Sequence, residues 1–171
     1  MAERAWILVG MMGVGKSTVG ELLAQRSGRQ HLDTDRSLVR KLGRPIPQLF
    51  QLFGETTFRD HETALLRSIE PGPLVISTGG GIVLRSQNWE EMRRLGITIF
   101  LSVDLDVLTA RLTTSKKKRP LLQGGAMEEK VEQILEQRLP LYRQADLTVE
   151  LADLDAQSAA LRVEEALRVR L

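Results

Sequence analysis

Short apolar runs, separated by polar and glycine-containing stretches, recur along the chain, and each of them predicts a buried strand. These runs occupy residues 5–9, 30–32, 74–77, 97–103 and 147–151. The runs at 74–77 and 97–103 are almost continuously apolar rather than alternating, which is typical of parallel strands covered on both faces. We therefore expect these two runs to be central strands of a parallel sheet.

Segments with apolar residues at helical spacing lie between the strands. Helices are predicted over residues 16–26, 37–42, 47–53, 55–69, 87–95, 105–112, 128–142 and 156–169. Pro47 suits the first turn of a helix and Gly54 suits the end of one, so 47–53 and 55–69 are expected to be separate helices. The alternation of strands and helices predicts an α/β protein, with helices on both faces of a parallel sheet.

Length and composition limit the possible classes of protein. The chain has 171 residues, which predicts one domain, and 42% hydrophobic with 27% charged residues is the composition of an ordinary globular protein. Lys and Arg number 24 and Asp and Glu 22, a formal net charge of +2. This near-neutral balance gives no argument for a nucleic-acid partner.

The chain contains no cysteine, which excludes disulfides, thiolate metal sites and a cysteine nucleophile. His31 and His61 are too few for most histidine-built metal centres, and we interpret both as structural or surface residues. The apolar run before Gly10 is much shorter than a signal-peptide core or a membrane span. We therefore expect a cytoplasmic protein that does not associate with a membrane.

Residues 10–17, Gly-Met-Met-Gly-Val-Gly-Lys-Ser, match the phosphate-loop pattern G-x-x-x-x-G-K-[ST] between a predicted strand and a predicted helix. In such a loop backbone N–H groups surround phosphate oxygens, the lysine reaches the outer phosphates, and the hydroxyl binds Mg²⁺. The motif predicts an ATP site made by Gly13, Val14, Gly15, Lys16, Ser17 and Thr18, with Ser17 as a direct magnesium ligand. Met11 and Met12 are expected to pack within the loop.

A phosphate loop alone does not separate a small-molecule kinase from other nucleotide-binding proteins. The chain lacks the Asn/Thr-Lys-x-Asp sequence that recognises guanine, and the strand at 74–77 ends in Ser77 where an acidic residue is usual. Asp33, after the second strand, is the obvious source of a carboxylate near Mg²⁺. Asp33 or Asp35 could instead cap the helix that follows, and both possibilities stay open.

Over essentially its full length the chain resembles the shikimate kinases. The residues that carry the resemblance stand in the family's order and spacing: the loop at 10–18, Asp33-Thr34-Asp35, Phe58-Arg59 with Glu62, Ser77-Thr78-Gly79-Gly80-Gly81, Lys118-Arg119-Pro120-Leu121-Leu122, and Arg138 before Leu141-Tyr142. The resemblance implies a five-stranded parallel sheet in the order 2-3-1-4-5, flanked by helices in three layers. It also implies one kinase domain over 1–171, with substrate-binding helices at about 34–61 and a mobile lid at about 113–126.

The implied reaction is transfer of a phosphoryl group from ATP, with Mg²⁺, to the 3-hydroxyl of shikimate, a step of aromatic amino acid biosynthesis. Shikimate carries one carboxylate and three hydroxyls, so its site needs cations at one end and hydrogen-bond acceptors at the other. The guanidinium groups of Arg59 and Arg138 suit the carboxylate. The resemblance assigns substrate binding to Asp35, Arg59, Gly80, Gly81 and Arg138.

Further roles also follow from the resemblance. Lys16, Asp35 and Arg119 are the implied catalytic residues, with Asp35 facing the attacking hydroxyl and Arg119 acting as the lid cation. Asp33 is expected to hold Mg²⁺ through water, with Ser77 close by. Arg111 is expected to stack on adenine, although residues 152–156, Ala-Asp-Leu-Asp-Ala, lack the proline that often forms the opposite wall.

Other interpretations stay open at this stage. Arg59 could be a solvated charge paired with Glu55 or Glu62, and Arg138 is not distinctive on a charged helix. The basic run at 116–119 could be a solvated loop or a weak nucleic-acid patch. The chain could also phosphorylate another small polyol or sugar acid such as gluconate, or bind nucleotide without catalysis. The favoured expectation is a monomer that binds shikimate and ATP, and neither nucleic acid nor membranes.

Overall fold

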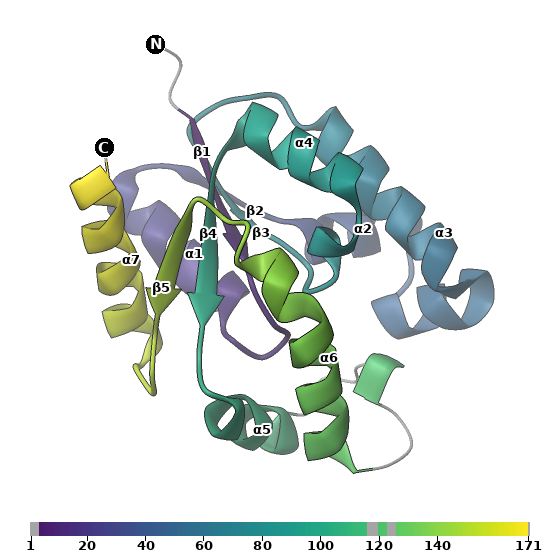
Figure 1. Ribbon diagram of the computed structural model, residues 1–171. Coiled ribbons are helices and arrows are strands. Elements are labelled where there is room, and N and C mark those ends of the chain that lie inside the picture. Colours follow the sequence, from purple (N-terminus) through teal and green to yellow (C-terminus); the bar gives the residue numbers. More distant parts are fainter. Residues whose placement is uncertain (1–3, 116–119, 123–125, 171) are drawn as a thin grey trace.

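The computed structural model describes residues 4–115, 120–122 and 126–170 and contains a five-stranded parallel sheet in the order β2-β3-β1-β4-β5 (Figure 1). The strands are β1 (Ala5–Val9), β2 (Gln30–Asp33), β3 (Leu74–Ser77), β4 (Gly96–Ser102) and β5 (Leu147–Glu150). Every neighbouring pair is parallel. The predicted fold class and strand order are confirmed, and β3 and β4 lie inside the sheet as their apolar sequences predict.

Helices follow the strands and cover both faces of the sheet. They are α1 (Lys16–Ser27), α2 (Thr34–Leu42), α3 (Ile46–Ser68), α4 (Ser86–Leu95), α5 (Leu105–Thr114), α6 (Met127–Tyr142) and α7 (Ala156–Arg170), with short 3₁₀ helices η1 (Ile82–Leu84) and η2 (Pro120–Leu122). Helices α1 and α7 pack together on one face, and α4 packs against β4 on the other (Figure 1). Within the described residues, no helix is long and apolar enough to cross a membrane.

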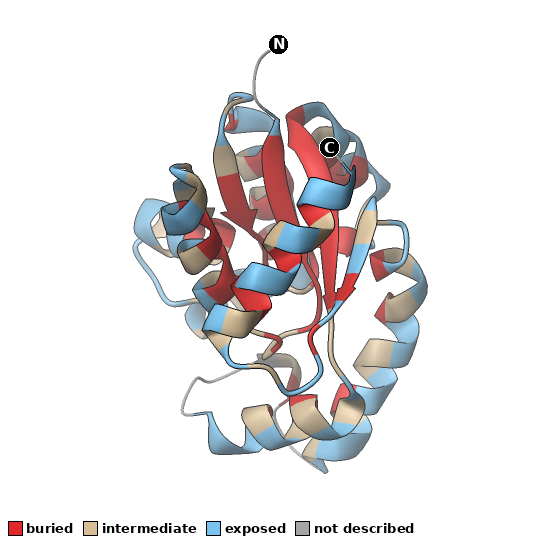
Figure 2. Cartoon of the chain, turned by 90° about the vertical axis from the view of Figure 1, so that its left-hand side faces the viewer, coloured by how far each residue is buried: buried red, intermediate tan, exposed pale blue. Residues whose placement is uncertain are grey.

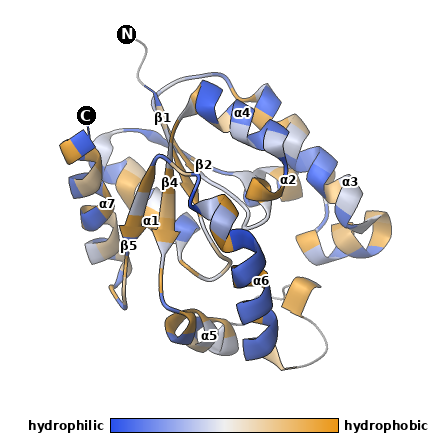
Figure 3. Ribbon diagram, viewed as in Figure 1, coloured by the Kyte–Doolittle hydropathy of each residue, from blue (hydrophilic) through white to orange (hydrophobic). Residues whose placement is uncertain are grey.

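The central strands form the core of the molecule. All five residues of β1 are buried, and so are six of the seven residues of β4. Figure 2 shows these strands in red between helices whose outer sides are pale blue, and Figure 3 shows the matching hydropathy. The phosphate loop after β1 and the residues after β3 therefore emerge from the buried centre of the sheet.

Helix α2 begins at Thr34, three residues earlier than the sequence predicts. The carboxylate of Asp33 accepts a 3.0 Å hydrogen bond from the backbone N–H of Arg36 and so caps the helix. The capping interpretation of Asp33 is thus confirmed, and it places Asp35 in the first helical turn. The helix ends at Gly43, whose φ of 68° is the left-handed conformation common at helix ends.

Helix α3 consists of two helical pieces that meet at Gly54. This residue has φ 78° and ψ 169°, a conformation outside the helical region and open to glycine. The predicted break between residues 53 and 55 is therefore present. The first piece contributes to a small second core that contains Leu38, Leu49 and Phe58, separate from the main core under the sheet.

The lid predicted at about 113–126 is only partly described. Residues 113 and 114 end α5, and Pro120–Leu122 form η2. Arg119 and the rest of the basic run at 116–119 lie outside the described residues, so the predicted lid role of Arg119 is not tested.

Candidate active site

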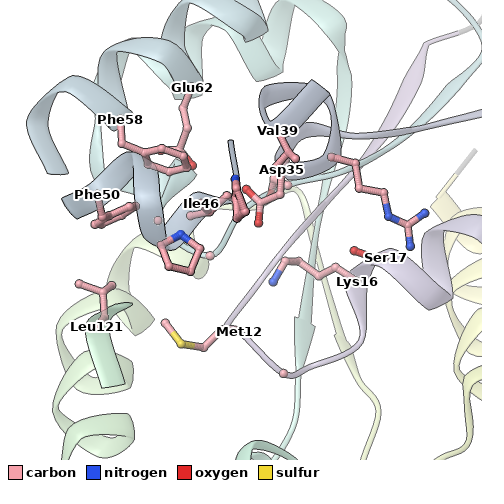
Figure 4. A pocket seen from close by; sticks show the side chains of 18 of the residues that line it. Met12, Lys16, Ser17, Asp35, Val39, Ile46, Phe50, Phe58, Glu62 and Leu121 are labelled. Carbon is pink, nitrogen blue, oxygen red and sulfur yellow. The ribbon is translucent and has the colours of Figure 1, made fainter. Parts of the chain in front are cut away.

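A cavity of about 780 Å³ lies beside the phosphate loop and the segment that follows β3 (Figure 4). Ten residues to which the sequence analysis assigns a binding or catalytic role line it: Gly13, Gly15, Lys16, Ser17, Thr18, Asp35, Arg59, Gly80, Gly81 and Arg138. Three others do not line it. These are Val14, which is buried within the loop, Asp33, which lies at the end of β2, and Arg111, which lies in α5.

The phosphate loop connects β1 directly to α1. A side chain at Gly10 would place its Cβ 2.7 Å from the carbonyl oxygen of Leu101, and Gly15, with φ 99°, caps α1. The ammonium of Lys16 donates hydrogen bonds to the carbonyl oxygens of Gly10, at 2.7 Å, and Met11, at 2.9 Å. This cation therefore lies over the loop, where positive charge and a helix N-terminus favour phosphate binding.

Ser17 and Asp33 form the polar corner next to the loop. The Ser17 hydroxyl donates a 2.5 Å hydrogen bond to the Asp33 carboxylate. Asp33 pairs with Ser77 in the β2–β3 register, so β2 supplies the carboxylate that the end of β3 lacks. Ser77 donates to the carbonyl oxygen of Lys16, at 2.8 Å, and its hydroxyl lies 2.9 Å from Nε2 of His31.

His31 therefore has the structural role that the sequence analysis expects. It is half-buried, and burial lowers its pKa, so the ring stays neutral over most of the neutral range. Because the Ser77 hydroxyl uses its hydrogen to donate to the backbone carbonyl oxygen of Lys16, it acts as acceptor towards His31, whose Nε2 must therefore carry a proton. Ser77 and His31 thus stabilise the start of α1, where the carbonyl oxygen of Lys16 accepts the hydrogen bond.

Arg59 is buried in the cavity wall and is held by two carboxylates. One side of its guanidinium donates to Glu62, at 2.7 Å, and the other to Glu55, at 3.1 Å. Arg59 thus pairs with Glu55 and Glu62, as one alternative interpretation expected. It is not a solvated surface charge, because only 6% of it is exposed. Although burial opposes the charge, Glu62 and Glu55 raise the pKa of Arg59 and keep it cationic.

Glu62 is the acidic residue of this site that the sequence analysis underrated. It is fully buried, and desolvation raises its pKa to about 7 against the opposing effect of Arg59; Asp35 raises it further. Its Oε2 binds Arg59, whereas its Oε1 accepts no hydrogen bond from any described residue. A buried, half-satisfied carboxylate at a cavity wall is suited to accept a hydrogen bond from a polar ligand.

Each glycine of the triplet after β3 allows a charged group to approach the backbone. A Cβ at Gly79 would lie 2.8 Å from Asp35 Oδ1 and 2.9 Å from Glu62 Oε1, and a Cβ at Gly81 would overlap the Arg59 guanidinium. At Gly80 it would lie 3.5 Å from Nη1 of Arg138. The triplet thus brings two cations and two carboxylates around one short stretch of main chain.

Arg138 projects from α6 and is only 5% exposed. Its Nη1 has no hydrogen-bond partner among the described residues. Although Arg138 is not distinctive in the sequence, it is therefore not a solvated surface charge. A buried, unsatisfied guanidinium N–H that lines a cavity is suited to bind an anion.

Arg111 lies at the other end of the phosphate loop. It donates to the carbonyl oxygen of Val14, at 3.1 Å, and to that of Leu154, at 3.4 Å, and its nearest carboxylate is Asp153, at 3.8 Å. Arg111 therefore contacts both the phosphate loop and the segment at 152–156, which was expected to form the wall of the adenine site opposite Arg111. Stacking on a base is not tested.

One wall of the cavity is apolar, which the sequence analysis did not predict. Ile46, Phe50 and Phe58 contribute from α3, Met12 from the phosphate loop, and Leu121 from η2 (Figure 4). Phe50 and Phe58 pack together with ring centroids 4.7 Å apart. The sequence shows which residues of this segment are apolar. It does not show that the break at Gly54 and the packing of α2 against α3 leave some of them facing a cavity.

The parallel sheet, the phosphate loop and two buried guanidinium groups that line the same cavity define the class of the protein, a phosphate-loop kinase that acts on a small molecule. A protein-family model described as Shikimate kinase matches residues 12–168. A shikimate kinase of Microcystis aeruginosa is 45% identical over 149 residues, covering 86% of this chain and 77% of its own. The chain belongs to the shikimate kinase family.

Solved structures agree with this assignment. The structure of shikimate kinase from Acinetobacter baumannii in complex with shikimate superposes with a TM-score of 0.92 at 37% identity, over 98% of this chain and 94% of that one. A gluconokinase from Sinorhizobium meliloti has a TM-score of 0.51 at 17% identity, over 98% and 97% of the two chains. That second likeness is one of fold alone and does not support the gluconate alternative.

Proposed function

We propose that the protein transfers the γ-phosphoryl group of ATP to the 3-hydroxyl of shikimate, producing shikimate 3-phosphate and ADP. The observation that carries the proposal is that the phosphate loop and two buried arginines, Arg59 and Arg138, face one cavity. Membership of the shikimate kinase family supports it, as does the similarity to a relative solved in complex with shikimate.

The carboxylate of the substrate binds at the arginine end of the cavity. Arg59 is oriented by Glu55 and Glu62, and Arg138 has an unsatisfied Nη1. Planar guanidinium groups hold a carboxylate in a defined orientation. Gly80 and Gly81 allow the ring of the substrate to lie against the backbone.

The hydroxyls of the substrate face the acidic side. Asp35 lines the cavity from the first turn of α2 and accepts the hydrogen bond of the attacking 3-hydroxyl. Orientation of that hydroxyl towards the γ-phosphate is the main requirement of phosphoryl transfer, since positioning and charge stabilisation supply most of the catalysis. Lys16 neutralises charge on the outer phosphates, and Arg119 acts from the lid.

The residues of the polar corner fit Mg²⁺. Ser17 and Asp33 provide a hydroxyl and a carboxylate in direct contact, and such hard oxygen donors suit this ion. No group of three or more His, Cys, Asp or Glu side chains among the described residues could hold a metal. The ion would be held by Ser17, by Asp33 through water, and by phosphates, as is usual for Mg²⁺ in kinases. When bound, the ion neutralises charge that develops on the phosphate oxygens.

A coupled assay that measures ADP tests the proposal. Shikimate, gluconate and other small polyols and sugar acids are offered at saturating ATP and Mg²⁺, and only shikimate should be phosphorylated rapidly. Lys16→Ala should abolish the transfer while circular dichroism shows a folded protein. No phosphorylation of shikimate by the wild type would refute the function, and full activity of Lys16→Ala would refute the role of the phosphate loop.

Further features of the proposal rest on the sequence. Arg111 stacks on the adenine and Arg119 closes over the transferring phosphoryl group. The cytoplasmic location, the monomeric state and the lack of a nucleic-acid partner also stay predictions.

A further inference from the structure

Tyr142 is the last residue of α6 and is completely buried. Its hydroxyl donates a 2.6 Å hydrogen bond to the carbonyl oxygen of Gly80, 62 positions earlier in the chain. Its ring stacks on Phe100 of β4, with centroids 5.1 Å apart and planes at 15°. The phenol is therefore fixed by the sheet at one end and reaches the glycine triplet with the other.

The carbonyl oxygens around Gly80 are also held from within the protein. Asn88 donates to Ile82, at 2.8 Å, and Trp89 donates to Val83, at 3.0 Å, both from α4. The carbonyl oxygens of Gly79 and Gly81 accept backbone hydrogen bonds within the turn. The peptide after Gly80 thus depends on a side-chain hydroxyl, whereas its two neighbours are held by backbone turns.

The direction of the Gly80 carbonyl determines where the next N–H points. In a trans peptide the C=O of one residue and the N–H of the next point in opposite directions, and the described chain contains no cis peptide. Because the Gly80 carbonyl points to Tyr142, the Gly81 N–H points away from Tyr142, and Gly81 itself lines the cavity. Gly81 lies beside Arg59, whose guanidinium occupies the space that a Cβ of Gly81 would need.

Tyr142 also lies close to Arg138. Burial raises the pKa of the phenol, while the charge and hydrogen bonding of Arg138 oppose this effect. The net pKa is raised, so the hydroxyl keeps its proton at neutral pH and remains the donor to Gly80. One hydroxyl therefore contacts both the main chain and a guanidinium group of the acid-binding end of the cavity.

We propose that Tyr142 is a positioning residue for the acid substrate. Its hydroxyl fixes the Gly80–Gly81 peptide so that the Gly81 N–H, Arg59 and Arg138 form one binding site for the carboxylate. This inference rests on the proposed function, because it assigns these groups to shikimate. Tyr142 itself does not touch the substrate.

Tyr142→Phe tests the inference, since it keeps the ring on Phe100 and removes only the hydroxyl. One lost hydrogen bond predicts that the calorimetric Kd for shikimate rises about threefold to tenfold, while that for ATP stays within about twofold. The matched control is Ser27→Ala, which removes a partly buried hydroxyl that donates to the carbonyl oxygen of Leu23, at 2.7 Å, at the end of α1 away from the phosphate loop. The control should keep both affinities.

A second measurement reports the peptide directly. In the ligand-free protein, Tyr142→Phe should shift the amide ¹⁵N resonance of Gly81 and the carbonyl ¹³C resonance of Gly80, whereas Ser27→Ala should leave both unchanged. Unchanged resonances with unchanged shikimate affinity would overturn the inference, as would equal weakening of both ligands. Failure of the proposed function is a different result, because wild-type protein would then fail to phosphorylate shikimate whatever the state of Gly81.

Discussion

The hydroxyl of Ser17 lies 2.5 Å from the carboxylate of Asp33, which joins the first turn of α1 to the end of β2. The same carboxylate caps α2 through the backbone N–H of Arg36. One side chain therefore connects the phosphate loop to the helix that carries Asp35. A change at Asp33 should therefore affect the binding of Mg²⁺ first.

Asp33→Asn keeps the size and the capping ability of the side chain but removes its charge. The Mg²⁺ concentration for half-maximal activity should rise about tenfold or more, in the range found for residues that support a metal from outside its direct ligands. Shikimate affinity, measured without nucleotide, should not change. Activity titrated with Mg²⁺ checks this, and an unaltered metal dependence would contradict the assignment.

Arg59→Lys keeps a positive charge but loses the planar fork that Glu55 and Glu62 orient. We expect the KM for shikimate to rise roughly tenfold or more, because hydrogen bonds to charged groups are among the stronger ones. The KM for ATP should change little. Steady-state kinetics with each substrate varied in turn measure the KM for shikimate and the KM for ATP. An equal rise in both KM values would argue against carboxylate binding by Arg59.

Gly79→Ala should disturb the acidic side of the site by steric contact alone. Its Cβ would lie 2.8 Å from Asp35 Oδ1 and 2.9 Å from Glu62 Oε1. We expect kcat/KM for shikimate to fall roughly tenfold, as expected when binding groups are displaced by a fraction of an ångström. Gly72→Ala is the matched control, since its Cβ would meet nothing within 4 Å. Equal activities of the two variants would show that the close approach is unimportant.

Glu62 should make stability depend on pH. Its folded-state pKa of about 7 lies above the ordinary value of 4.5. The contribution of Glu62 to the free energy of unfolding is therefore present below about pH 4.5 and is lost as the pH rises through about 7. Glu62→Gln cannot ionise. Its free energy of unfolding, relative to that of the wild type, should therefore rise as the pH increases from 5 to 8, by on the order of 3 kcal/mol at most. Urea denaturation at several pH values measures the difference, and a constant difference would rule the effect out.

The alternation of apolar runs and amphipathic segments was sufficient to predict the parallel sheet and its two central strands. It was less reliable at helix starts, because the start of α2 depends on a cap: the Asp33 carboxylate accepts the Arg36 N–H. The phosphate loop was predictable because its function depends on a local backbone shape that one continuous motif encodes.

The environment of the candidate site depends instead on contacts between distant segments. The sequence shows Glu62 three residues after Arg59 but does not show that both are buried, or that Glu62 and Asp35 both lie close to Gly79. The contact of Tyr142 with Gly80 spans 62 positions and has no local pattern at all. Such pairs follow from how α3 and α6 are placed around the segment after β3, which spacing along the chain does not specify.

The glycine triplet also bears on how the protein could escape an inhibitor. Resistance commonly arises when a side chain in contact with a drug is replaced, but the triplet offers a compound only main-chain atoms. Any residue larger than glycine at position 79 or 81 would collide with Asp35 and Glu62, or with Arg59. A compound anchored on this stretch of backbone would therefore leave the protein few substitutions that weaken the compound and spare the substrate.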